Sequence, residues 1–365
     1  MEFLENPEIA LENIVESIRL DEARLERMKS SYSAITSLLA NDKDFFAQFG
    51  DKIEVYAQGS ASIGTTIKPI NDDFDLDIVL HIDCDYKKFS PAILYNNLVR
   101  VFRDSPRYGD KYERKNRCVR INYKDDFHMD ILPGFSNKTA GETVICVPDR
   151  EIQGWTVSDP KGYTDWFLNI SRNIVAREDF SFVKSSLETK EFEKINDKPL
   201  KDAVMVLKMY RNEYFKDDDD KKTPSIILTT LAGLSYKGSG TILGTLKQFA
   251  KYTRSKSSSG VVRIENPVLP SENLSERWEK DNTIYKAFFG FLDSLEEKIA
   301  DLEETANDFE LRESVIKSMV NQVNYARGVE HFSALAQQNM KENDFGIIRE
   351  MAKPKTELHR PYCLE

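Results

Sequence analysis

Two aspartates share one face of a predicted β-strand, and this feature constrains the fold of the chain more than any other. Between Phe74 and Ile82 apolar residues occupy every second position, so Asp75 and Asp77 fall together on the opposite face. Charges on a central strand are costly unless a metal or another partner offsets them. The sequence therefore predicts a sheet that directs two carboxylates into one volume.

A second strand supplies a third carboxylate. The segment 127–132 alternates in the same way and places Asp130 on the face opposite its apolar residues. Residues 117–123 are predicted to form its antiparallel partner, with 124–126 as the turn. Mg²⁺ prefers oxygen ligands and usually keeps substrate phosphates among them, so this carboxylate set suits a site that carries a nucleoside triphosphate.

A glycine-containing turn precedes the first strand. Gln58, Gly59 and Ser60 lie upstream of Asp75; Gly59 permits close backbone approach to phosphates, and Ser60 offers a hydroxyl. Taken singly, these features also fit a plain turn, a solvated acidic pair and a hairpin surface residue. Their order along the chain is far less ordinary, and together they predict the active site of a nucleotidyltransferase.

The order Gly-Ser, Asp-x-Asp and a later single Asp resembles the DNA-polymerase-β-like nucleotidyltransferases. Longer segments resemble a narrower family, the bacterial CD-NTases, which synthesise nucleotide second messengers in CBASS anti-phage systems. These segments are QGSASIGTTIKPINDDFDLDIVL, FHMDILPG and SDPKGYTDWF. The resemblance covers most of the chain. It implies an α+β fold: a polymerase-β-like lobe with a mixed sheet, an oligoadenylate-synthase-like helical lobe, and an N-terminal spine helix that bridges both.

The resemblance also implies roles for individual residues. Asp75, Asp77 and Asp130 would be catalytic and would hold two Mg²⁺ ions, or Mn²⁺, one with the donor triphosphate and one near the acceptor hydroxyl. Asp130 would also accept the hydroxyl proton. The implied nucleotide-binding residues are Gln58, Gly59, Ser60, Lys208 and Ser225.

Two elements of the C-terminal half would carry the donor contacts. In the helix predicted over Leu200–Tyr214, Lys208 lies off the apolar stripe; spacing alone makes it a solvated residue, whereas the resemblance makes it a phosphate-binding lysine. Thr223 and Pro224 suit the N-cap and first position of the next helix, so free amides around Ser225 can hold an anion. Ordinary capping explains the same residues.

The chain is predicted to fold in two parts. A helix expected over Pro7–Leu39, with Ile14, Ile18 and Leu25 on its apolar stripe, would form the spine. Strand and turn signals alternate from about 53 to 132, and helices dominate after Asp165. We expect a nucleotidyltransferase core over residues 1–160 and a helical lobe over 161–365 that completes the nucleotide cleft.

Charge and cysteine content narrow the functional class. The formal net charge of −10 argues against an extensive basic face, so no long nucleic acid is expected to be required. The four cysteines lack the spacing of a zinc site or a disulfide framework. Neither a signal peptide nor a run long enough to span a membrane is evident. We expect a cytoplasmic monomer without membrane attachment.

These features predict an enzyme that makes a cyclic di- or oligonucleotide second messenger from nucleoside triphosphates, with release of pyrophosphate, for a downstream effector in anti-phage signalling. Three alternatives stay open: an RNA-tailing enzyme, a nucleotidyltransferase that modifies a small molecule or a protein, and an inactive nucleotide sensor. The complete set of three aspartates argues against the sensor. The bases used and the linkage and ring size of the product do not follow from the sequence.

Overall fold

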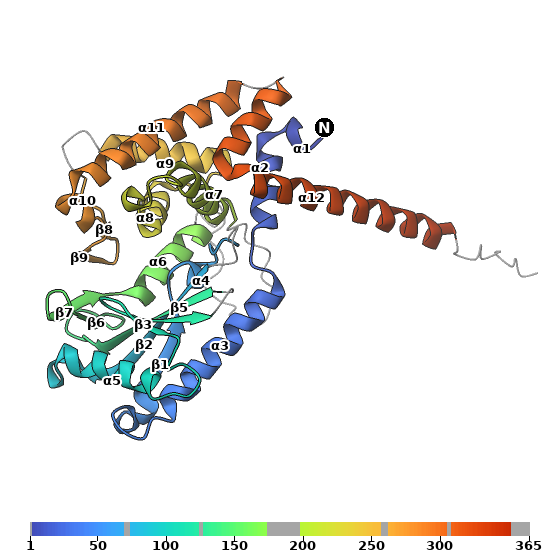
Figure 1. The fold of residues 1–365 in the computed structure, drawn as a ribbon. Helices are drawn as coiled ribbons and strands as arrows, with labels where there is room; N and C mark the ends of the chain where they lie inside the picture. The colour runs from blue at the N-terminus through green and yellow to red at the C-terminus, as the bar shows by residue number, and fades with distance from the viewer. Residues whose placement is uncertain are drawn as a thin grey trace, which may run out of the picture.

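The protein folds into two lobes that are joined along one side by its N-terminal helices (Figure 1). The computed structural model describes residues 2–68, 74–123, 127–173, 198–256, 262–304 and 308–351, except for the side chains of Glu2, Phe74, Asn173 and 339–351. The first lobe holds a mixed sheet and the second is helical, which confirms the predicted α+β class. In the described part of the chain, no helix combines the length and apolarity needed to cross a bilayer.

A 7-stranded sheet forms the centre of the first lobe. Its strands are β1 (Ile53–Ala57), β2 (Phe74–Asp85), β3 (Tyr112–Arg114), β4 (Val119–Tyr123), β5 (Phe127–Ser136), β6 (Ile145–Asp149) and β7 (Gly154–Ser158). The main path runs β1-β2-β5-β4-β3, and β6 joins β5 to β7. The three strands predicted from alternation are β2, β4 and β5. The turn predicted at 124–126 lies outside the described residues.

Helices cover the apolar face of this sheet. Leu76 and Ile78 of β2 and Met129 of β5 are buried in one core together with side chains of the helices α3 (Glu22–Ala40) and α5 (Pro91–Arg103). α5 begins where the chain favours it, because Ser90 caps the helix and Pro91 occupies its first position. The apolar half of each alternating strand therefore lies against helices, which leaves the carboxylate-bearing half facing away from this core.

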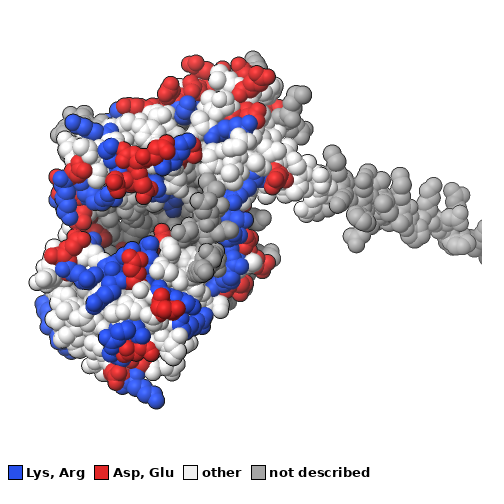
Figure 2. All heavy atoms as spheres, in the orientation of Figure 1, with Lys and Arg blue, Asp and Glu red and all other residues white. Residues whose placement is uncertain are grey.

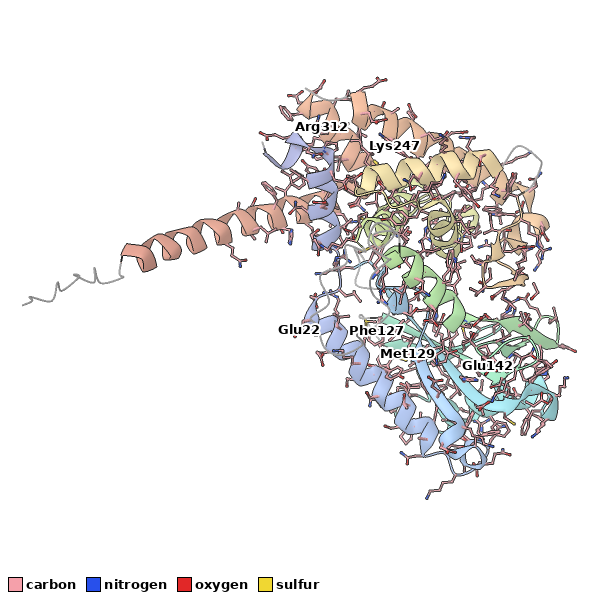
Figure 3. All side chains as sticks on the ribbon, turned by 180° about the vertical axis from the view of Figure 1, so that it is seen from behind. Glu22, Phe127, Met129, Glu142, Lys247 and Arg312 are labelled. Atoms are coloured by element: carbon pink, nitrogen blue, oxygen red, sulfur yellow. The ribbon has the colours of Figure 1, made fainter. Side chains whose placement is uncertain are left out.

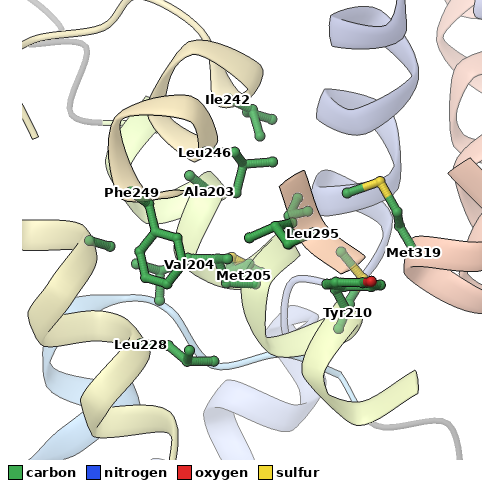
Figure 4. Close-up of a cluster of buried hydrophobic side chains, with 14 of the residues drawn as sticks. Ala203, Val204, Met205, Tyr210, Leu228, Ile242, Leu246, Phe249, Leu295 and Met319 are labelled. Carbon is green, nitrogen blue, oxygen red and sulfur yellow. The ribbon is translucent and has the colours of Figure 1, made fainter. Parts of the chain in front are cut away.

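The second lobe is built around the helix α7 (Lys198–Tyr214), which is buried over most of its length. Figure 4 shows its side chains packed among those of the neighbouring helices. The other helices of the whole chain are α1 (Glu2–Glu5), α2 (Pro7–Ser17), α4 (Gly59–Ile63), α6 (Pro160–Asn173), α8 (Ser225–Ser235), α9 (Ile242–Lys256), α10 (Glu276–Lys280), α11 (Asn282–Glu304) and α12 (Phe309–Met351). Short 3-10 turns lie at Phe46–Gln48, Gly50–Lys52, Tyr86–Lys88 and Asp219–Lys221. A small hairpin is formed by β8 (Glu265–Asn266) and β9 (Leu269–Asn273).

The predicted single spine helix over Pro7–Leu39 is wrong in its continuity. The chain forms α2 and α3 with a break between them, and the Asp21 side chain caps α3 by accepting from the Arg24 amide at 2.9 Å. The carbonyl of Ile18 in the break accepts from the amide of Lys68 at 2.7 Å. An aspartate that caps a new helix and a carbonyl used by another segment explain why the helix stops here.

The two spine helices belong to different cores. Ile14 of α2 is buried among the helices of the second lobe, whereas Ile35 of α3 is buried against the sheet. Leu25, which was predicted on the apolar stripe, is 41% exposed. Figure 3 shows Glu22, at the start of α3, below the helical lobe that contains Arg312. The pair still bridges both lobes. The division of the chain at residue 160 stays a prediction; β7 ends at Ser158 and α6 begins at Pro160.

The helix α12 crosses α2 closely and then extends away from both lobes (Figure 1). It is bent at Asn321, whose backbone is non-helical (φ 65°, ψ 168°) and whose side chain accepts from the Asn324 amide at 3.0 Å. At the crossing, a Cβ on Gly328 would lie 2.4 Å from Ile14 Cγ1 and 3.0 Å from Ile14 Cα. Glycine therefore lets the two helices approach to backbone contact.

Gly328→Ala should destabilise the protein although alanine favours helix. The helix preference is worth about 1 kcal/mol, but the added methyl meets the Ile14 backbone, which cannot rotate away, and overpacking of this kind costs roughly 1–3 kcal/mol. We expect a lower midpoint in urea unfolding. Gly240→Ala is the matched control, because a Cβ there meets nothing within 4 Å. Equal midpoints for Gly328→Ala and wild type would show that separating the helices costs no more than the helix preference of alanine provides, about 1 kcal/mol.

Candidate active site

β2 and β5 bring the three predicted carboxylates to one face of the sheet. The strands run parallel, and their register pairs Asp77 directly with Asp130 and Asp75 with His128. Directly paired residues present their side chains on the same face. Asp75, Asp77 and Asp130 therefore point away from the core that contains Leu76, as the alternation predicted.

The predicted turn before β2 is the start of the short helix α4. The Gln58 amide donates to the Asp77 carbonyl at 2.9 Å. Gly59 has φ +60°, and a Cβ built on it would lie 2.9 Å from Asp77 Oδ2. A side chain at this position would displace the carboxylate and strain the backbone, so glycine is required. Ser60 accepts a hydrogen bond from the Thr66 hydroxyl at 3.1 Å. Phosphate contacts by these residues stay a prediction.

Asp77 lies where a negative charge is hard to maintain. Burial, together with the charges of Asp130 and Asp75, raises the pKa of its carboxyl to about 7. The positive charges of Arg120 and Lys208 act in the opposite direction. Since desolvation and like charges both disfavour the carboxylate, added positive charge is the natural complement of this site.

Arg120 of β4 is a site residue that sequence reasoning missed. It is paired with Asp130 in the β4–β5 register. Its Nε lies 2.7 Å from Asp130 Oδ1, its Nη2 lies 2.8 Å from Asp130 Oδ2, and Nη2 also lies 3.3 Å from Asp75 Oδ1. These hydrogen bonds raise the pKa of the guanidinium. The signal was available, because pairing 117–123 with 127–132 places a residue of the first strand beside Asp130.

The three carboxylates suit a hard divalent cation by their chemistry. All are oxygen donors, as Mg²⁺ and Mn²⁺ prefer, and the raised pKa of Asp77 reflects a local need for positive charge. In the present side-chain arrangement, no group of three or more His, Cys, Asp or Glu residues is placed to hold a metal ion within the described ranges. Arg120, rather than a shared centre, takes both oxygens of Asp130.

Lys208 is not on a solvated face, which corrects the expectation from helical spacing. α7 is buried almost all round, and Lys208 is only 5% exposed. Its Nζ donates to the carbonyl and hydroxyl oxygens of Thr65, at 2.9 and 3.0 Å, in the loop after α4. Burial, with the charge of Arg211, lowers the pKa of its ammonium group to about 7. A buried lysine that contacts only neutral oxygens is prepared for an anion.

Arg211 is a second cation of the same kind, one turn further along α7. Its guanidinium donates to the Thr223 carbonyl at 3.2 Å and to the Ser225 hydroxyl. Burial lowers the pKa of this guanidinium to about 10, so it stays charged at neutral pH. Sequence reasoning did not identify Arg211.

The predicted cap of α8 is wrong in detail. α8 begins at Ser225, its N-cap is Pro224, and no side chain caps it. The Thr223 hydroxyl is fully buried and has no hydrogen-bond partner in the described structure. Ser225 does lie at the helix start, as expected, and Arg211 binds its hydroxyl. The free amides and positive end of α8 therefore adjoin the guanidinium of Arg211.

The space between the lobes is open on the face shown in Figure 2, where the surface is hollowed between the sheet lobe and the helical lobe. The carboxylates come from strands of the first lobe, and Lys208 and Arg211 come from α7 of the second. The electrostatic effect of Lys208 on Asp77 links the two sets. A triphosphate between the lobes could contact cations on one side and carboxylate-held metal on the other.

Binding of a nucleoside triphosphate without metal should weaken as the pH rises above 7. Lys208 is charged below its pKa of about 7 and neutral above it, and the anion prefers the charged form. Binding should therefore take up a proton, with an affinity loss of at most about tenfold per pH unit. Calorimetry in buffers of different ionisation enthalpy measures both quantities.

Two variants make this pH test specific. Lys208→Met should weaken binding and remove the proton uptake that depends on the lysine. Lys247→Met is the control, because Lys247 is a surface residue of α9 that pairs with Glu303. A pH dependence that is the same in Lys208→Met and wild type would assign the proton to another group.

Comparison with protein families identifies the first half of the chain. Residues 7–170 match the family model described as the Second Messenger Oligonucleotide or Dinucleotide Synthetase domain. The chain is also 35% identical over 347 residues to the c-di-GMP synthase of Roseivirga ehrenbergii, a match that covers 93% of this chain and 91% of that protein.

Solved structures agree at the level of the fold. The Bradyrhizobium diazoefficiens CD-NTase CdnG in complex with GTP superposes with a TM-score of 0.70 at 18% identity, covering 89% of this chain and 97% of that one. E. coli CdnC with ATP superposes with a TM-score of 0.62 at 12% identity, covering 86% and 98%. Because a relative with 35% identity spans nearly the whole chain, this protein belongs to the second messenger oligonucleotide or dinucleotide synthetase family, the CD-NTases, and is a nucleotidyltransferase.

Proposed function

We propose that the enzyme joins two molecules of GTP into cyclic di-GMP and releases two molecules of pyrophosphate. The observation that carries the reaction type is the face of β2 and β5 on which Asp75, Asp77 and Asp130 lie together. The choice of guanine is supported by the c-di-GMP synthase that matches 93% of this chain. We further propose that the product acts on a downstream effector in anti-phage defence.

The acidic face is proposed to bind Mg²⁺ or Mn²⁺, up to two ions. Asp75 and Asp77 would hold the ion that accompanies the donor triphosphate, and Asp130 would join them at the acceptor hydroxyl. When bound, the metal supplies Lewis acidity that favours loss of the hydroxyl proton and stabilises charge on the transferred phosphoryl group. Asp130 would accept the proton of the attacking hydroxyl, and Gly59 keeps the space beside Asp77 free of a side chain.

The second lobe is proposed to bind the donor triphosphate. Lys208 and Arg211 contact neutral oxygens in the described structure, so their charges are available to an anion. Ser225 and the amides at the start of α8 would add hydrogen bonds. Gln58 and Ser60 would contact the phosphates from the first lobe, at the end of β1 and the start of α4.

No long nucleic acid is proposed as an activator. On the face shown in Figure 2, basic and acidic side chains are interspersed over both lobes and no broad basic surface is visible. A duplex activator would need many lysines and arginines arranged along its phosphates. The two cations proposed to bind phosphate, Lys208 and Arg211, instead come from one helix, α7.

Product analysis tests the function directly. Purified enzyme is incubated with Mg²⁺ and each nucleoside triphosphate alone or in pairs, treated with phosphatase, and analysed by mass. We expect GTP alone to give one phosphatase-resistant product with the mass of two GMP units less two waters. A product that requires a second base, or that phosphatase shortens, would replace the proposal of cyclic di-GMP. Extension of added RNA would favour a tailing enzyme.

Asp77→Asn should abolish synthesis without loss of the fold. Removal of the charge should reduce pyrophosphate release by at least roughly a hundredfold, as for other groups that stabilise transition-state charge. Because the pKa of Asp77 is raised to about 7, the folded protein binds this proton more tightly than the unfolded chain, so stability falls as the pH rises from about 4 to 7. Asparagine does not titrate, so the variant does not lose this stability as the pH rises.

We therefore expect the melting temperature of Asp77→Asn at pH 8, with a chelator, to equal or exceed that of wild type. Asp83→Asn is the matched control, because Asp83 lies on the same strand but pairs with the surface residue Lys138. Asp83→Asn should keep full activity. If Asp77→Asn retained wild-type turnover, Asp77 would not be a metal ligand.

A further inference from the structure

We propose that Arg120 occupies the place of a divalent cation at Asp130, so that an ion shared by Asp75, Asp77 and Asp130 binds only when Arg120 releases Asp130. Arg120 is then a positioning residue that controls when the acceptor side of the site is complete. The inference rests on the proposed function, because it concerns the same carboxylates.

The contact with Arg120 occupies the side of the Asp130 carboxylate on which a shared metal ion would have to bind. Both oxygens of Asp130 accept from the guanidinium, at 2.7 and 2.8 Å, in the planar two-point arrangement that arginine makes with carboxylates. The same Nη2 lies 3.3 Å from Asp75 Oδ1. A single guanidinium thus bridges two of the three residues that the shared ion would need.

The three carboxylates are not equally blocked. Arg120 contacts Asp130 most closely and Asp75 more loosely, whereas Asp77 is linked to it only through its charge. Of the two carboxylates that contact Arg120, Asp75 is the more exposed: 59% of its side chain is exposed, against 16% for Asp130. An ion at Asp75 and Asp77 can therefore bind first, and the ion that needs Asp130 has to compete with Arg120.

Release of Asp130 requires a side-chain movement, because the backbone partners are fixed. Arg120 and Asp130 are directly paired in the β4–β5 ladder, so the strands hold them side by side in every state of the sheet. The Arg120 side chain is 23% exposed and so has access to solvent. A guanidinium that leaves a carboxylate needs another anion, and nucleotide phosphates are the anions that this reaction supplies.

Binding of Mn²⁺ measures this competition without any turnover. Free and bound Mn²⁺ are counted by electron paramagnetic resonance with wild type, Arg120→Gln and Arg120→Lys, first without nucleotide and then with a non-hydrolysable GTP analogue. In wild type we expect one ion to bind without nucleotide and a second to bind more weakly. In Arg120→Gln the second ion should bind roughly tenfold more tightly, since a charge-assisted contact to Asp130 no longer opposes it.

Arg120→Lys separates occupation of Asp130 from a general effect of positive charge. Lysine keeps the charge but cannot occupy both oxygens in a planar fork, so the second ion should also bind more tightly in this variant. Addition of the GTP analogue should tighten the second ion in wild type and have a smaller effect in Arg120→Gln. If Arg120→Lys bound Mn²⁺ as weakly as wild type, or if Arg120→Gln showed no gain, the proposal would be overturned.

Three further variants locate the effect. Arg117→Gln removes a neighbouring arginine that pairs with Asp149 at 2.6 Å outside the site, and it should bind Mn²⁺ as wild type does. The double variant Arg120→Gln/Asp130→Asn should lose the gain of the single variant; a retained gain would place the ion elsewhere and overturn the proposal. Asp77→Asn tests the proposed function separately, because unchanged Mn²⁺ binding there would remove the metal site itself, whatever Arg120 does.

Discussion

The parallel pairing of β2 with β5 is the constraint on which the rest of the site depends. It sets Asp77 beside Asp130 on one face, where burial, together with the negative charges of Asp130 and Asp75, raises the pKa of Asp77 to about 7. Two neighbouring residues, Gly59 and Arg120, accommodate these carboxylates. Gly59 leaves space for the Asp77 carboxylate, and Arg120 binds Asp130 from the adjacent strand. The sheet register thus determines the electrostatics, and the electrostatics determine which side chains can surround it.

The helical lobe contributes the opposite charge. Burial of these cations removes them from water, and a bound anion would compensate for that desolvation. Lys208 is buried in α7 and reaches across to Thr65 of the sheet lobe. Burial lowers the pKa of Lys208 to about 7 and that of Arg211 to about 10. Cations retained in such positions with neutral partners are rarely structural, because apolar residues would pack there with less desolvation cost. Their position opposite the carboxylates is consistent with a triphosphate held between the lobes.

Local patterns in the sequence predicted what local physics determines. Alternation located β2, β4 and β5 and the common face of Asp75, Asp77 and Asp130. Helical spacing failed for Lys208, because the part of α7 around it is packed among other helices and is buried on nearly every side. It also failed at residues 18–21, where the break between α2 and α3 depends on a cap at Asp21 and on a distant backbone donor. Arg120 required the register between two strands, which composition and periodicity of one strand do not contain.

The donor and acceptor sides of the proposed site differ in how far they are prepared. Lys208 and Arg211 are held by carbonyl and hydroxyl oxygens, which a phosphate can supplement without breaking an ion pair. Arg120 is held by a carboxylate through two short hydrogen bonds, so its contact must be exchanged before Asp130 can act. Preorganised positive charge favours binding at the donor side first. In the proposed mechanism, this asymmetry would keep Asp130, the proposed proton acceptor, in contact with Arg120 until nucleotide phosphates draw the guanidinium away.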